Sequence, residues 1–80
     1  MPHYYFHVHN SIGFVEDEEG RDLPDRDVAR QEAIKGIRSI LSEDVLGGFI
    51  DLAGRIEVVE EGSGDPALTV PFDEAVDVRT

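Results

Sequence analysis

The three histidines of this chain lie within its first nine residues, at a spacing that places them together. Residues 3–9 read His-Tyr-Tyr-Phe-His-Val-His, and alternate residues of a strand point to opposite faces. One face is therefore apolar, and the other carries side chains that titrate or form hydrogen bonds: His3, Tyr5, His7 and His9. Imidazole binds metals and transfers protons near neutral pH, so this second face is the first candidate for chemistry.

His7 and His9 have the spacing of a metal-binding pair. Two histidines at i and i+2 project from one strand face and can hold one zinc ion, with a third ligand from His3, Asp17 or Glu57. No spacing in the sequence fixes that third ligand. A polar or partner-facing sheet surface explains the same residues without a metal. We therefore expect no metal and no cofactor, and keep the metal site as an alternative.

Pro2 is the candidate for a catalytic residue. Removal of Met1 would leave a secondary amine at the start of a strand, which acts as a general base if it titrates near neutrality. Tautomerases obtain their catalytic base in this way, but they continue directly from that strand to a helix, whereas a second strand is expected here. The sequence also lacks a Ser-His-Asp arrangement, a phosphate-binding glycine loop and an HExxH motif. We therefore expect a protein that is not an enzyme.

The charge of the chain restricts its partners. Eighteen Asp and Glu residues stand against seven Lys and Arg residues, for a formal net charge of -11. Proteins that bind nucleic acid use clustered positive charge to neutralise phosphates, and the seven basic residues here are dispersed. We expect neither nucleic acid nor an anionic membrane as a partner. A protein partner is expected instead, and a basic one would suit this surface.

Composition also indicates the surroundings of the protein. The absence of cysteine excludes disulfides and thiolate metal sites. No apolar stretch approaches the roughly 20 residues needed to span a bilayer, and the first residues do not resemble a secretory signal. We expect one domain over residues 1–80, located in the cytoplasm.

The elements that must position the histidine strand follow from periodicity, caps and turns. A turn at Asn10-Ser11 precedes a second strand, and Asp25 can cap a helix that the glycines at 47 and 48 end. The acidic run over residues 16–19 is expected to be a solvated turn. The expected elements are a strand over 12–17, a helix from Asp25 or Asp27 to about Leu46, strands over 55–60 and 67–70, and a helical turn over 73–76.

These elements predict an α+β fold in two layers, with the order β-β-α-β-β and one helix on one face of a four-stranded antiparallel sheet. Gly36, in the middle of the helix, is expected to let the helix approach the sheet closely. The predicted core is Tyr4, Phe6, Val8, Phe14, Ala29, Ala33, Ile37, Ile40, Leu41, Ile56, Val58, Leu68, Val70 and Phe72.

One helix leaves the second face of such a sheet uncovered. A mixture of tyrosine, histidine and valine is typical of an association surface, and a chain of 80 residues gains burial by association. We therefore expect a homodimer, formed through this face or through an exposed edge strand. The candidate interaction residues are His3, Tyr5, His7, His9, Val15, Arg55, Glu57 and Val59.

Ordered motifs extend over nearly the whole chain and support a family resemblance. They are Met1-Pro2-x-Tyr4-x-Phe6-His7-Val8, Asp17-Glu18-Glu19-Gly20-x-x-Leu23-Pro24-Asp25, Ala29-Arg30-x-Glu32-Ala33, Gly54-Arg55-x-Glu57-Val58 and Leu68-x-Val70-Pro71-Phe72. With these motifs the chain resembles a family of short, mostly alphaproteobacterial proteins classed as a domain of unknown function. The resemblance implies a small intracellular bacterial domain and no particular activity. His3 and His9 stand where arginine or another polar residue is expected, so a site built on all three histidines is not a family trait.

The chain is also similar, more weakly, to the HicB-type antitoxins. The shared features are a strand pair, an acidic glycine turn, a Leu-Pro-Asp-like segment and a helix containing Glu-Ala. Those antitoxins sequester a small basic toxin, but this chain lacks their DNA-binding extension. The expected function is a non-enzymatic protein-interaction module. The alternatives are a HicB-like antitoxin that binds a basic toxin, a metal-binding protein that uses the histidine face, and a tautomerase-like enzyme with an N-terminal proline.

Overall fold

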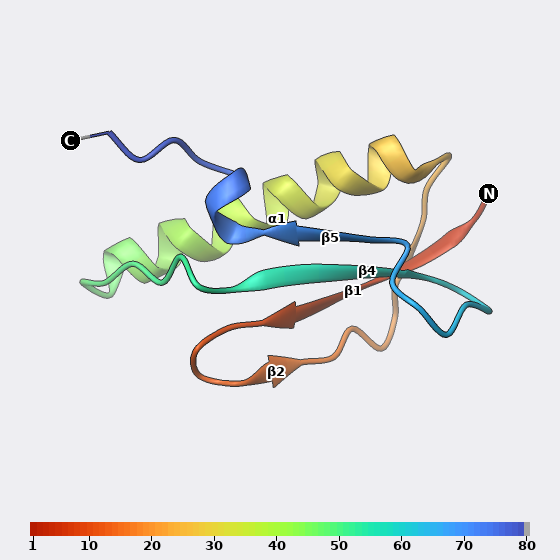
Figure 1. Cartoon of the computed structure of the whole chain (residues 1–80), viewed down its shortest axis with the longest axis horizontal. Helices are drawn as coiled ribbons and strands as arrows, with labels where there is room; N and C mark the ends of the chain where they lie inside the picture. The colour runs from red at the N-terminus through yellow and green to blue at the C-terminus, as the bar shows by residue number, and fades with distance from the viewer. Residues whose placement is uncertain (80) are drawn as a thin grey trace.

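The computed structural model describes residues 1–79, which form an antiparallel sheet with one long helix on one face (Figure 1). The elements in chain order are β1 (His3–His9), β2 (Phe14–Val15), β3 (Arg21–Asp22), α1 (Arg26–Leu46), β4 (Arg55–Glu60), β5 (Leu68–Pro71) and the 3-10 turn η1 (Phe72–Glu74). Across the sheet the order is β2-β1-β4-β5, and β3 pairs with the same edge of β1 as β2. The predicted α+β fold is confirmed.

The outer edge of β1 is paired in two separate places. β2 lies opposite Val8 and His9, whereas β3 lies opposite His3 and Tyr4. The second strand, predicted over residues 12–17, is present and antiparallel to β1, but it includes only Phe14–Val15. An unbroken strand would turn alternate carboxylates of the run 16–19 toward the apolar face, which is costly, and the chain leaves the ladder there instead.

Helix α1 forms as its caps and its apolar spacing predict. The side chain of Asp25 accepts a hydrogen bond from the Val28 amide at 2.9 Å, and Gly47 ends the helix. Asp27 adds a negative charge in the first turn, where the helix dipole favours it. The buried side chains recur every four residues and make one narrow stripe that faces the sheet: Ala29, Ala33, Ile37 and Leu41.

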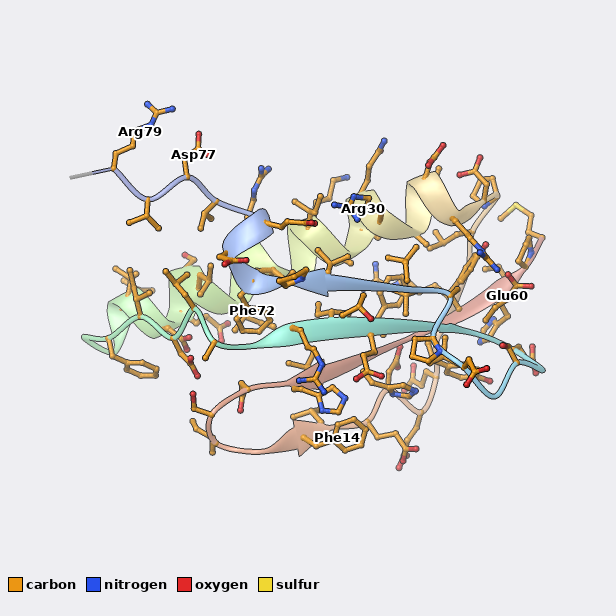
Figure 2. All side chains as sticks on the ribbon, viewed as in Figure 1. Phe14, Arg30, Glu60, Phe72, Asp77 and Arg79 are labelled. Atoms are coloured by element: carbon orange, nitrogen blue, oxygen red, sulfur yellow. The ribbon has the colours of Figure 1, made fainter. Side chains whose placement is uncertain are left out.

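The core lies between this stripe and the apolar side of the sheet. Its largest fully buried side chains are Tyr4, Phe72, Ile37, Val58 and Val70, and Figure 2 shows Phe72 between the sheet and the helix. The predicted core is confirmed for the other buried members Ala29, Ala33, Leu41 and Ile56, while Phe6, Val8, Ile40 and Leu68 are partly buried against it. The prediction of Phe14 as a core residue is wrong, because 54% of its surface is exposed.

The register of the first hairpin explains the position of Phe14. Asn10 and Gly13 exchange backbone hydrogen bonds of 2.9 and 3.2 Å, so the loop between them has two residues. Phe14 therefore pairs with His9, and Val15 pairs with Val8. A shift of one residue moves a side chain to the other face of a sheet, so Phe14 and Val15 have exchanged the faces that the sequence predicted.

The close approach between elements occurs at Gly54 and not at Gly36. A Cβ atom on Gly36 would lie 3.7 Å from the side chain of Ile56, an ordinary contact, so the expected close packing at this glycine is wrong. A Cβ atom on Gly54 would lie 2.5 Å from the ring of Phe72 and 2.8 Å from the carbonyl oxygen of His9. Only glycine allows the ring of Phe72 to pack against the start of β4 in this way.

The helix covers only part of its side of the sheet. Helix α1 packs on β4 and β5, and its C-terminal end extends beyond the sheet (Figure 1).

After β5 the chain turns back to the helix through η1, where Arg38 donates a hydrogen bond of 2.7 Å to the carbonyl oxygen of Ala75. The helical turn predicted over residues 73–76 is present but begins one residue earlier, at Phe72, and Pro71 precedes it without a side-chain cap. None of the helices within residues 1–79 combines the length and the hydropathy needed to cross a bilayer.

Candidate functional site

The side of the sheet that faces away from α1 carries the candidate residues, and we call it the open face. Residues that pair directly across an antiparallel ladder share a face. The register therefore places on the open face the side chains of His3, Tyr5, His7, His9, Phe14, Asp22, Arg55, Glu57, Val59 and Thr69.

An unbroken row of aromatic rings runs along the open face. The centroid of the Tyr5 ring is 5.0 Å from that of His3 and 6.3 Å from that of His7, and the last two rings are parallel. Phe14 continues the row from the neighbouring strand, with its centroid 5.8 Å from His7 and 4.6 Å from His9. Figure 2 shows Phe14 projecting from β2 at the edge of the sheet. The spacings are those of favourable aromatic pairs.

His3 is held at the β1–β3 edge by both ring nitrogens. Its Nδ1 lies 2.7 Å from a carboxylate oxygen of Asp22, and its Nε2 lies 2.8 Å from the carbonyl oxygen of Glu19. The hydrogen bond to Asp22, together with the bond to the Glu19 carbonyl, raises the pKa of His3 above its ordinary value. The charged form of His3 is thus favoured by the acidic partner across the ladder.

Asp17 lies between β2 and β3, where no strand pairs with the outer edge of β1. Its carboxylate accepts backbone hydrogen bonds from Phe6 at 3.0 Å, from Gly20 at 3.1 Å and from Glu19 at 3.3 Å. Its own amide donates to Nδ1 of His7 at 3.1 Å. Partial burial alone would raise the pKa of Asp17, but the three amides together lower it. The carboxylate therefore provides a hydrogen-bond acceptor for the Phe6 amide of β1, which neither β2 nor β3 pairs.

The third histidine belongs to a small charged group at the other end of the row. Nε2 of His9 lies 3.1 Å from a carboxylate oxygen of Glu57, and the Arg55 guanidinium lies 3.1 Å from the same oxygen. Each histidine thus has a separate local partner. Among residues 1–79, no three His, Asp or Glu side chains are placed to hold one metal ion. What this arrangement offers directly is an aromatic and polar contact surface.

The open face contains all of the predicted interaction residues except one. Val15 lies on the helix side, opposite Val8, and Phe14 occupies the place expected for it. The length of the hairpin loop is the only signal that distinguishes the two, and Asn10-Ser11 is a weak turn signal. Pro2, the candidate base, accepts a hydrogen bond of 3.0 Å from the Leu23 amide through its carbonyl oxygen.

Two further surfaces were not predicted from the sequence. One is a groove of about 560 Å³ on the helix side, between α1, β1, β2 and the acidic loop. The other is an apolar groove of about 660 Å³ at the overhanging end of α1. Large side chains are exposed around this end, with Leu46 at 86%; the others are Val45, Phe49, Ile50 and Val78.

The chain matches a protein family over most of its length. Residues 3–73 match a family described as a domain of unknown function (DUF6894). Neither a curated protein nor a solved structure matches the chain.

Proposed function

Because the chain belongs to this family of domains of unknown function, DUF6894, we propose its function from its surface: it is a non-enzymatic protein-interaction domain that pairs with a second copy through the open face. The absence of cysteine suits a reducing compartment, and we place the protein in the cytoplasm. Proteins, and not nucleic acids, are the partners that a net charge of -11 favours.

The aromatic row is the observation that carries this proposal. Aromatic side chains are enriched in protein interfaces because they contribute a large contact area at a low cost in side-chain entropy. Here five rings lie in contact along one sheet face, and the helix packs on the opposite face. Rings that already touch one another lose little freedom when a partner covers them, so the row is a preorganised contact surface.

The size of the open face limits how strong the pairing can be. The strands β1, β2, β4 and β5 have seven, two, six and four residues, so at about 3.3 Å per residue and about 4.8 Å between strands they give a face of roughly 300 Å². Two copies would then bury roughly 600 Å², which is well below the range of stable interfaces and allows only a weak one. The expected product is a dimer that dissociates at micromolar concentrations.

Sedimentation velocity over a wide concentration range tests the proposal. The variant Phe14→Lys should weaken association about tenfold, because it places a charge within the row. Ile12→Lys is the matched control, since Ile12 is 86% exposed on the same hairpin and outside the row. A monomer at high micromolar concentration, or unchanged association of Phe14→Lys, contradicts the proposal. Loss of association in Leu46→Lys would move the interface to the end of α1.

The three alternatives predict different experimental results. Stoichiometric zinc binding that is lost in a His7→Ala, His9→Ala double variant would support the metal-binding protein. Proton exchange on a keto-enol substrate that is lost in Pro2→Ala would support the tautomerase-like enzyme. Neutralisation of a small basic toxin would support a HicB-like antitoxin, which is a special case of the protein-interaction domain.

A further inference from the structure

The layer that holds α1 has room for a second helix. Four strands about 4.8 Å apart make a sheet face roughly 19 Å wide, whereas one helix with its side chains is about 10 Å across. Helix α1 packs on β4 and β5, and Tyr4 at the start of β1 is buried, so the uncovered half of this face lies over β2 and over β1 beyond Tyr4.

The groove of about 560 Å³ occupies this uncovered half. Its floor is formed by Phe6 and Val8 of β1 and by Val15 of β2, which is 61% exposed. Its wall on the α1 side includes Ile40 and Gly36, and the missing side chain of Gly36 widens the groove. The groove therefore accepts apolar side chains from above.

The rim of the groove is strongly acidic. Four acidic side chains of the loop line it, from Glu16 to Glu19, and Glu32 lines it from α1. Within residues 1–79 no ion pair is formed by Glu16, Glu18 or Glu19, so their charge is not compensated locally. An acidic rim above an apolar floor favours a partner that combines positive charge with apolar side chains.

Arg21 shows how a basic side chain fits the groove. Its guanidinium carbon lies 5.2 Å from the centre of the Phe6 ring, and its NH1 lies 2.9 Å from a carboxylate oxygen of Glu32. The chain thus places one of its own cations between the apolar floor and the acidic wall. This pair is partly exposed to solvent, so it contributes little stability and can be exchanged for an equivalent pair with a partner.

We propose that this groove binds an amphipathic helix of another protein, with its apolar side on Phe6, Val8 and Val15 and with lysine or arginine beside the acidic rim. The bound helix would lie next to α1 and complete the helical layer, as helix-in-groove recognition does. This inference names a partner class for the proposed interaction domain and uses the face opposite the one that pairs with a second copy.

Fluorescence anisotropy with defined peptides tests the proposal. The probe is a labelled peptide of about 18 residues that contains only leucine and lysine, arranged as an amphipathic helix. One control peptide has the same composition in scrambled order, and another has glutamate in place of lysine. Saturable binding of the first peptide alone is expected. Equal binding of the scrambled peptide would mean charge attraction without a groove and would overturn the proposal, as would no binding.

Variants of the protein then locate the binding. Val15→Lys should weaken binding of the leucine–lysine peptide at least about tenfold, whereas Ile12→Lys, an equal change outside the groove, should not. Glu18→Lys should weaken it more than Asp65→Lys, which makes the same change of charge in the loop between β4 and β5. Arg21→Ala should strengthen it several-fold, because the internal competitor is removed. Unchanged binding in all the groove variants overturns the proposal.

The same samples separate this inference from the homodimer. Phe14 lies on the open face, so the variant Phe14→Lys should bind the peptide as tightly as the unmodified protein does. A protein that stays monomeric but binds the peptide contradicts the pairing and leaves the groove proposal intact. If Val15→Lys dissociated a dimer, a second copy of the chain would occupy the groove, and the proposal that the groove binds a helix of another protein would be overturned.

Discussion

Asp17 should be the acidic residue of the loop that stabilises the fold most. Its carboxylate accepts hydrogen bonds from the amides of Phe6, Gly20 and Glu19. Buried bonds to a charged acceptor contribute about 1.5–3 kcal/mol each, but this group is partly exposed and water screens it. Asp17→Ala should therefore lower the free energy of unfolding by about 2 kcal/mol, a large part of the roughly 4–12 kcal/mol expected for a chain of this size.

The variant Asp17→Asn tests the role of the two carboxylate oxygens. Oδ2 accepts from Phe6, while Oδ1 accepts from Gly20 and Glu19. An asparagine side chain has one oxygen and would direct an NH₂ group at one of these donors. Asp17→Asn should therefore lower the free energy of unfolding by about 1 kcal/mol, which is less than the effect of Asp17→Ala.

Urea unfolding followed by far-ultraviolet circular dichroism measures both effects, since the chain has no tryptophan. The dependence of the free energy on urea should not change, because the same surface is exposed on unfolding. Glu18→Ala is the control, and it should change stability by less than about 0.5 kcal/mol. Hydrogen exchange at the Phe6 amide should accelerate in Asp17→Ala.

The pH dependence provides an independent check on the same reasoning. The pKa of Asp17 is lowered in the folded protein, so its stabilisation is present above the unfolded pKa of about 3.9 and is lost as the pH falls through the lower folded pKa. The difference between the unmodified protein and Asp17→Ala should therefore shrink in acid. This account would be refuted if Asp17→Ala lowered the free energy of unfolding by less than about 0.5 kcal/mol at neutral pH, or if its effect did not depend on pH.

Three further predictions concern single contacts. The pKa of His3 is raised chiefly by its hydrogen bond to Asp22, so an NMR titration should show a lower pKa for His3 in Asp22→Asn. The stability that this bond contributes is present below the ordinary pKa of about 6.5 and should be lost as the pH rises through the higher pKa of the folded protein. Gly36→Ala should raise the free energy of unfolding by about 0.5–1 kcal/mol, because the methyl group fits, and thermal unfolding measures this. Gly54→Ala should lower it by about 2 kcal/mol, because the methyl group would collide with Phe72; equal melting temperatures of the two alanine variants would contradict both assignments.

Features that depend on a few neighbouring residues could be predicted from the sequence. The alternation in β1 is local, and so is the four-residue spacing of the buried side chains of α1. The capping of α1 by Asp25 also depends only on residues within one helical turn. For the same reason, all but one of the candidate interaction residues lie on the open face as predicted.

The features that the sequence alone did not determine depend on distant segments. The face on which Phe14 and Val15 lie depends on the loop length of a hairpin, and one residue reverses it. The requirement for glycine at position 54 arises from the ring of Phe72. The groove exists because α1 packs over β4 and β5 and leaves β2 and the part of β1 beyond Tyr4 uncovered. Periodicity shows which side of a helix or strand is apolar, but only the packing of the elements decides how much of that side is covered.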